Sequence, residues 1–121
     1  MVLVDTSVWV DHWRRSDAVL VSLLHEGEVA CHPFILGELA CGNLHDRGQV
    51  IDLLAALPAL PKSDDQEVLF FIAQHRLMGT GLGLVDVHLL ASCALAAIPL
   101  WTRDANLRHA AGALSLDSGQ R

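Results

Sequence analysis

The sequence predicts an α/β fold with a mostly parallel sheet that helices cover on both faces. The alternation of two kinds of apolar segment supports this prediction. Short aliphatic segments alternate with longer segments whose apolar residues recur at helical spacing, which is typical of parallel strands joined by helices. The chain has 121 residues, enough to bury a core of its own, and it contains no linker, repeat or low-complexity segment. We therefore expect one domain over residues 1–121.

The strands are predicted from short runs of aliphatic and β-branched residues, which pack well in a buried sheet. The helices are predicted from apolar residues spaced three or four apart, such as Trp9 and Trp13. Strands are expected at Val2–Val4, Val29–Cys31, Ile98–Thr102 and Leu114–Leu116. Helices are expected at Thr6–Arg14, Asp17–His25, Pro33–Leu44, Val50–Leu57, Asp64–Leu77, Val85–Ala97 and Ala105–Ala111.

Composition narrows the classes of protein. Hydrophobic residues make up 52% of the chain, but no apolar run approaches the ~18 residues that span a bilayer. The start lacks the basic segment of a signal peptide, so we expect a cytoplasmic protein with no membrane partner. The surplus of apolar residues favours a covered face, as in a homodimer or a tight complex.

Cysteine and histidine usage argues against a zinc site. Cys31, Cys41 and Cys93 form no close pair, and we expect small buried thiols in a reducing compartment. The seven histidines form no zinc-binding motif. The net charge of −6 also argues against a general duplex-binding protein, which is usually basic.

Four acidic residues stand out because of their predicted positions. Asp5 and Asp104 follow predicted strands, whereas Glu38 and Asp86 lie on helix faces otherwise occupied by apolar or small residues. In an open α/β sheet the carboxyl ends of the strands surround the ligand crevice. Carboxylates gathered there repel one another unless they are protonated or bridged by a divalent cation.

Each acid also has a simpler explanation that the sequence leaves open. Asp5 and Asp86 could cap the helices beside them. For Asp104, a helix cap and an ion pair with Arg108 one turn later would suffice. Glu38 has no such local partner. Together, however, four hard oxygen ligands suit Mg²⁺ or Mn²⁺, and such ions can activate water and stabilise a phosphate during hydrolysis.

Four segments carry a resemblance to a known family: Leu3-Val4-Asp5-Thr6-Ser7-Val8-Trp9, Glu38-Leu39-Ala40, Gly83-Leu84-Val85-Asp86 and Leu100-Trp101-Thr102-Arg103-Asp104. In this order they resemble the PIN-domain ribonucleases, and most closely the VapC toxins of bacterial toxin–antitoxin (VapBC) pairs. The resemblance implies a three-layer α/β/α sandwich, Mg²⁺- or Mn²⁺-dependent cleavage of RNA, and inhibition by a VapB-type antitoxin.

By the same resemblance, Asp5, Glu38, Asp86 and Asp104 are the catalytic, metal-holding acids, with Asp5 and Asp86 as the principal ligands. Thr6 or Ser7, together with Thr102, would orient a ligand or a water. Many family members have another acid where this chain has Asn106, whose amide oxygen could still bind a metal or its water.

Other interpretations and features remain open at this level. A non-catalytic PIN-like binding module is one alternative, and a small metal-dependent phosphatase is another, although Ser7 replaces the second acid of a phosphatase motif. An arginine of the antitoxin could enter the acidic crevice. The glycine-rich residues 79–83 predict a loop feeding the Asp86 helix. Four arginines are candidate phosphate contacts or simply solvated helix ends: Arg14, Arg15, Arg76 and Arg103.

Overall fold

The computed structural model describes residues 1–121 and has a three-stranded parallel sheet in the order β2-β1-β3. The strands are β1 (Val2–Val4), β2 (Val29–Ala30) and β3 (Leu100–Trp101). All their residues are buried. Because successive side chains of a strand point to opposite faces, this burial requires cover on both faces of the sheet, as predicted.

Two irregular segments extend the sheet at its edges, both in parallel register. Cys31 bridges to Ala59 beyond β2, and Leu100 bridges to Asp117 beyond β3. The predicted strand at Leu114–Leu116 is wrong: Leu114 ends the last helix and Ser115 has a φ of 59°. The chain must turn there, and only from Leu116 does it hydrogen-bond to β3.

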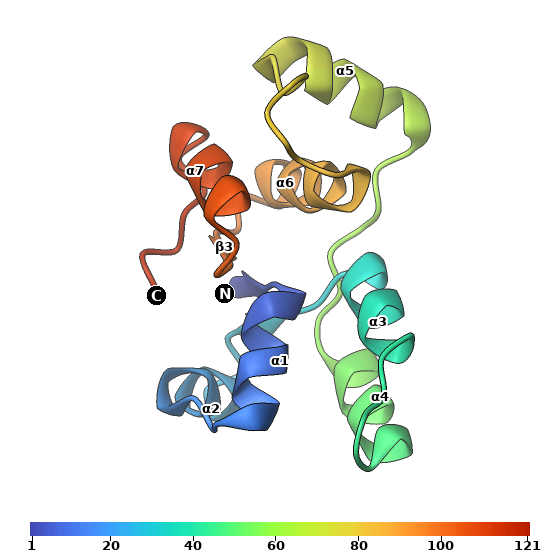
Figure 1. Ribbon diagram of the computed structural model, residues 1–121, viewed down its shortest axis with the longest axis vertical. Coiled ribbons are helices and arrows are strands. Elements are labelled where there is room, and N and C mark those ends of the chain that lie inside the picture. Colours follow the sequence, from blue (N-terminus) through green and yellow to red (C-terminus); the bar gives the residue numbers. More distant parts are fainter.

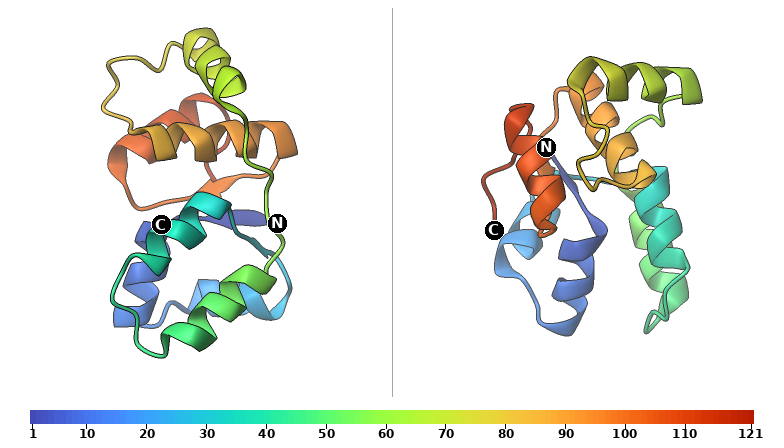
Figure 2. Two further views of the ribbon diagram at one scale, coloured as in Figure 1. Left: turned by 90° about the vertical axis from the view of Figure 1, so that its right-hand side faces the viewer. Right: turned by 45° about the horizontal axis from the view of Figure 1, so that its top comes forward.

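Seven helices surround the sheet, and Figure 1 shows the first four toward one end of the molecule and the last three toward the other. Figure 2 shows the strands enclosed between these two groups. The helices pack in pairs, with α3 on α4, α5 on α6 and α1 on α3. Their bounds are α1 (Thr6–Arg14), α2 (Ala18–His25), α3 (Pro33–Ala40), α4 (Arg47–Ala56), α5 (Asp65–His75), α6 (Leu84–Ala96) and α7 (Ala105–Ala113).

The predicted helices are all present, and their ends show where local turn chemistry matters. The predicted helix Pro33–Leu44 ends four residues early, because the chain turns at Cys41 before Gly42 and Asn43, residue types that favour turns. The next helix begins at Arg47 rather than Val50, preceded by Asp46 in the left-handed conformation.

A core of 26 buried hydrophobic residues joins the sheet to the helices. Cys31 and Cys93 belong to it, and burial raises the pKa of Cys93 to about 12. The expectation for Cys41 is wrong, since it is exposed at the end of α3. Trp9 is in the core, whereas Trp13 is 37% exposed and stacks on it. None of the helices is long and apolar enough to cross a membrane.

Candidate active site

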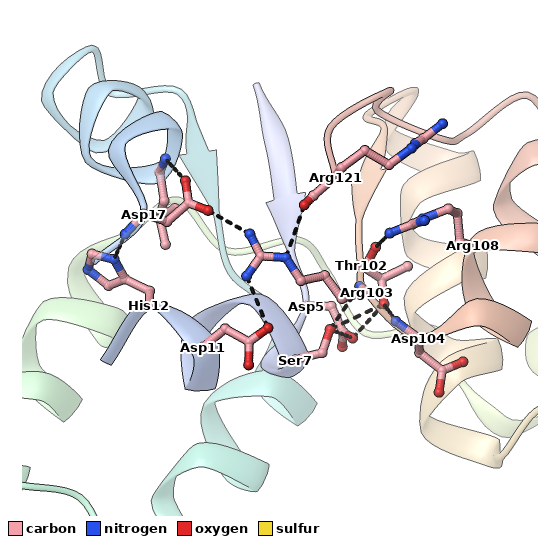
Figure 3. A network of polar contacts seen from close by, with 11 residues as sticks. Asp5, Ser7, Asp11, His12, Asp17, Thr102, Arg103, Asp104, Arg108 and Arg121 are labelled. Atoms are coloured by element: carbon pink, nitrogen blue, oxygen red, sulfur yellow. Dashed lines mark hydrogen bonds and ion pairs between the residues drawn. The ribbon is translucent and has the colours of Figure 1, made fainter. Parts of the chain in front are cut away.

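Asp5 is the most buried of the four acids, with 7% of its surface exposed. It directly follows β1 and occupies the N-cap position of α1, yet its side chain accepts no capping hydrogen bond. Its Oδ2 instead accepts hydrogen bonds from Ser7 Oγ and Thr102 Oγ1, both at 2.8 Å. The capping explanation therefore fails for Asp5. Figure 3 shows the three side chains meeting between α1 and the end of β3.

Backbone N–H groups determine which way these two hydroxyls point. The Arg103 N–H donates to Ser7 Oγ at 3.0 Å, and the Asp104 N–H donates to Thr102 Oγ1 at 3.1 Å. Since a hydroxyl has only one proton, each oxygen accepts from the backbone and donates to Asp5. The pair orients the carboxylate through Oδ2, and no protein group donates to Oδ1.

Asp86 and Asp104 lie near enough to Asp5 for their charges to interact. Burial raises the pKa of Asp86, the Gly83 N–H at 3.2 Å opposes that rise, and the negative charges of Asp5 and Asp104 add to it. Asp86 is half-buried in the first turn of α6. The structure thus places three carboxylates, which follow β1, open α6 and cap α7, close enough for their charges to interact.

Asp104 is exposed at the N-cap of α7, where one carboxylate oxygen accepts the Leu107 N–H at 2.9 Å. The cap belongs to the simpler explanation of Asp104, but the ion pair with Arg108 that completes that explanation does not form. The Arg108 guanidinium turns back and donates to the Thr102 carbonyl at 3.1 Å. The second carboxylate oxygen of Asp104 has no protein donor.

Glu38 lies apart from this group. It is exposed on α3, and its carboxylate accepts a hydrogen bond from Thr6 Oγ1 at 3.0 Å. The expectation that Glu38 stands on a face devoted to the core is therefore wrong, and its partner comes from α1 rather than from its own helix. Through Thr6, which follows Asp5 in the chain, Glu38 borders the same site from the α3 side.

Asn106 contacts the glycine-rich loop that leads into α6. Gly81 has a φ of 82°, and a Cβ added to it would lie 3.0 Å from Asn106 Nδ2. The left-handed backbone conformation favours glycine there, and a larger residue would also have to displace the Asn106 side chain. The loop feeds α6, as expected, and places Gly83 so that its N–H meets Asp86.

The donor chemistry of the three aspartates fits a hard divalent cation. No group of three or more His, Cys, Asp or Glu side chains is close enough together to hold a metal ion by itself. Mg²⁺, however, keeps several of its waters and commonly takes only one or two carboxylates directly. Burial is the main cause of the raised pKa of Asp86, and the negative charges of Asp5 and Asp104 add to it; a divalent cation relieves repulsion of this kind.

A second polar network lies beside the acids, and sequence reasoning missed it. The Arg103 guanidinium donates to Asp11 at 3.1 Å, to Asp17 at 2.5 Å and to the Arg121 carbonyl at 3.1 Å, as Figure 3 shows. It also lies over the Trp101 ring, 5.5 Å from the centroid. Arg103 is therefore neither a free phosphate contact nor a solvated helix end.

The pKa shifts of Asp17 and Arg103 stabilise the charged forms that make the ion pairs. Burial alone would lower the pKa of Arg103, but the carboxylates of Asp17 and Asp11 raise it. Burial would raise the pKa of Asp17, but hydrogen bonds from the Leu20 N–H and from Arg103 lower it. Because the Arg103 backbone also holds Ser7, the network fixes the turn after β3 against α1.

Fold and site together define the class of protein. Residues 2–113 match the PIN domain family, and the chain belongs to that family. Two relatives from strains of Mycobacterium tuberculosis, both named Ribonuclease VapC32, are each 50% identical to it over 111 residues. These residues cover 91% of this chain and 90% of each relative, and the family match over residues 2–113 includes the whole candidate site.

Proposed function

We propose that the chain forms one nuclease domain over residues 1–121, which hydrolyses RNA phosphodiester bonds internally with Mg²⁺ or Mn²⁺. The observation that carries this proposal is the placement of Asp5, Asp86 and Asp104, where burial raises the pKa of Asp86 and the charges of Asp5 and Asp104 add to the rise. Membership of the PIN family and the ribonuclease names of the relatives support RNA as the substrate.

Asp5 and Asp86 would be the principal metal ligands, with Asp104 and Glu38 completing the acidic set. When bound, the cation would stabilise charge on the scissile phosphate and make a water more acidic. The protein's own contribution is orientation. Ser7 and Thr102 hold Asp5 in one position, Thr6 does the same for Glu38, and Asn106 would position a water.

We further propose that the enzyme is the toxin of a toxin–antitoxin pair and acts in the cytoplasm, where its RNA substrate is found. The similarity to VapC proteins supports this role. A VapB-type antitoxin would inhibit it by placing an arginine against the acidic site, which would compete with metal and substrate. If changing each arginine of the antitoxin tail left inhibition intact, this mode of inhibition would be wrong.

The test of activity compares Asp5→Ala and Asp86→Ala with Asp52→Ala, which removes an exposed carboxylate from α4 outside the site. Wild type and Asp52→Ala should cleave RNA with Mg²⁺ or Mn²⁺ and stop when a chelator is added. The two site variants should be inactive while folded. A calorimetric Mn²⁺ titration separates this enzyme from a non-catalytic binding module, which has no reason to bind the ion through these acids.

A homodimer is also proposed, formed through the face shared by α5 and α6. A groove of about 480 Å³ lies there between Phe70, Phe71 and Leu95, and Phe70 and Leu95 are 68% and 67% exposed. A two-fold interface uses the same patch on both subunits. The exposed Phe70 ring of each subunit could enter the groove of the other, so one patch supplies both sides of such an interface.

A further inference from the structure

The basic side chains of this protein are few, and most are already engaged. Of the eight, five contact carboxylates, carbonyls or an aromatic ring. Three make no hydrogen bond or ion pair and are exposed: Arg14, Arg15 and Arg76. A polyanionic substrate that meets an acidic protein needs cations outside the metal site, so the location of these three residues matters.

Two of the three free arginines line one polar pocket. It has a volume of about 410 Å³ and is lined by Asp11, Arg14, Arg15, Ser16, Asp17 and Arg103, with no hydrophobic residue. The two aspartates are paired with the one guanidinium of Arg103, which compensates part of their negative charge. With three arginines and two aspartates in its lining, the pocket has a net charge of +1, and Arg14 and Arg15 are the arginines without a carboxylate partner.

The pocket is connected to the candidate active site along one face of α1. Ser7, Asp11 and Arg14 are spaced at i, i+4 and i+7 and therefore share a face of the helix. Arg103 lies along the same face, since its backbone binds Ser7 and its guanidinium binds Asp11. A single polar stripe thus leads from the hydroxyl that orients Asp5 to the free arginine.

We propose that Arg14 and Arg15 form a subsite for a backbone phosphate of the RNA strand that is being cleaved. This inference rests on the proposed ribonuclease function. From Ser7 to Arg14 the helix rises by about 10 Å, so Arg14 lies about two helical turns from the hydroxyl that orients Asp5. The phosphate held there is therefore not the scissile one but a neighbour along the strand.

The chemistry of the pocket favours a phosphate over a protein segment. Arginine presents a planar fork of donors that matches phosphate oxygens, and the Ser16 hydroxyl adds another donor. Strong protein contacts centre on buried apolar or aromatic anchors, which this lining lacks.

The experiment uses Arg14→Gln/Arg15→Gln, with Arg76→Gln as the control because it removes a free arginine at the end of α5, outside the pocket. Glutamine keeps much of the side-chain stem and removes the charge. Cleavage of an RNA oligonucleotide is measured at several salt concentrations, and its binding is measured by fluorescence anisotropy with chelator present. Thermal unfolding checks that each variant is folded.

The double variant should weaken RNA binding and raise KM by about 5- to 10-fold at low salt, with kcat changed less than about twofold. The slope of log binding constant against log salt should become shallower by about 0.7, the value for one phosphate contact on a single strand. Arg76→Gln should stay within about twofold of wild type in binding and KM, because a lone distant charge is screened.

The outcomes separate the two proposals. A wild-type protein that neither binds nor cleaves RNA overturns both. A wild type that cleaves RNA, with a double variant of unchanged KM and salt slope, overturns the subsite alone. A double variant that cleaves normally but escapes a protein inhibitor assigns the arginines to that inhibitor instead, and also overturns the RNA subsite.

Discussion

Replacing Thr102 with valine tests how Asp5 is held. Thr102 is 2% exposed, and its hydroxyl donates to Asp5 at 2.8 Å and accepts from the Asp104 N–H at 3.1 Å. Valine keeps the shape and removes both hydrogen bonds. A hydrogen bond to a charged group contributes about 1.5–3 kcal/mol and an ordinary one about 1 kcal/mol, so the free energy of unfolding should fall by about 2–4 kcal/mol.

The measurement is urea unfolding at neutral pH with chelator, together with RNA cleavage. Because Asp5 loses one of its two orienting donors, we expect kcat to fall on the order of 10- to 100-fold. Thr80→Val is the control: Thr80 is exposed and donates only to the Leu77 carbonyl, so it should change stability by less than about 0.5 kcal/mol. A Thr102→Val protein that unfolds like wild type and cleaves at the same rate would refute the reasoning.

Three other predictions follow from burial and charge. Asp86→Asn should stabilise the metal-free protein, kept so by a chelator, at neutral pH, because a raised pKa means that the ionised carboxylate is disfavoured in the folded state. Calorimetric melting should show this stabilisation, and Mn²⁺ should no longer stabilise the variant. An unchanged effect of Mn²⁺ would contradict the ligand role of Asp86. Burial is the main cause that lowers the pKa of His32 from 6.5 to about 4 in the folded protein. As the pH falls below 6.5, the His32 imidazole is therefore protonated in the unfolded chain before it is protonated in the folded protein. The free energy of unfolding should drop by up to about 3 kcal/mol near pH 4. His32→Asn can still accept the Phe34 N–H and should lose less stability between neutral and acidic pH in urea unfolding; an equal loss would assign the acid sensitivity elsewhere. Phe70→Asp should convert a dimer to a monomer in light scattering, whereas Leu53→Asp, at an exposed apolar position on α4, should not; a dimer that persists in Phe70→Asp would place the interface on another face.

Most of the fold was predictable because it depends on local patterns. The run Val2–Val4 is buried on both faces of the sheet, and such strands are recognisable from aliphatic residues alone. The helices follow from apolar spacing, and α1 has the bounds that the sequence predicts. The errors lie at boundaries, where Cys41 ends α3 and Ser115 turns the chain. At these positions a few turn-favouring residues end the helix, although the apolar spacing alone would let it continue.

The positions of the three aspartates were predictable from the ends of strands and the starts of helices, but the surroundings of Glu38 and the hydrogen bonds of the site were not. Ser7 and Thr102 are 95 residues apart, and nothing in either local sequence shows that both hydroxyls meet Asp5. The partners of Arg103 are 86 and 92 residues away. Arg103 was expected as a phosphate contact or a solvated helix end, and no local pattern around Asp11 or Asp17 indicated the contact across the fold.

The Arg103 network explains how an acidic protein can carry arginine beside its candidate active site without using that charge for substrate. Its guanidinium is neutralised by Asp11 and Asp17, so its contribution is positional: it fixes the turn that holds Ser7 and Thr102 around Asp5. In the proposed enzyme, electrostatic attraction for RNA would come from a divalent cation at the aspartates and from Arg14 and Arg15. If so, salt should affect mainly binding, whereas removing the metal should abolish turnover.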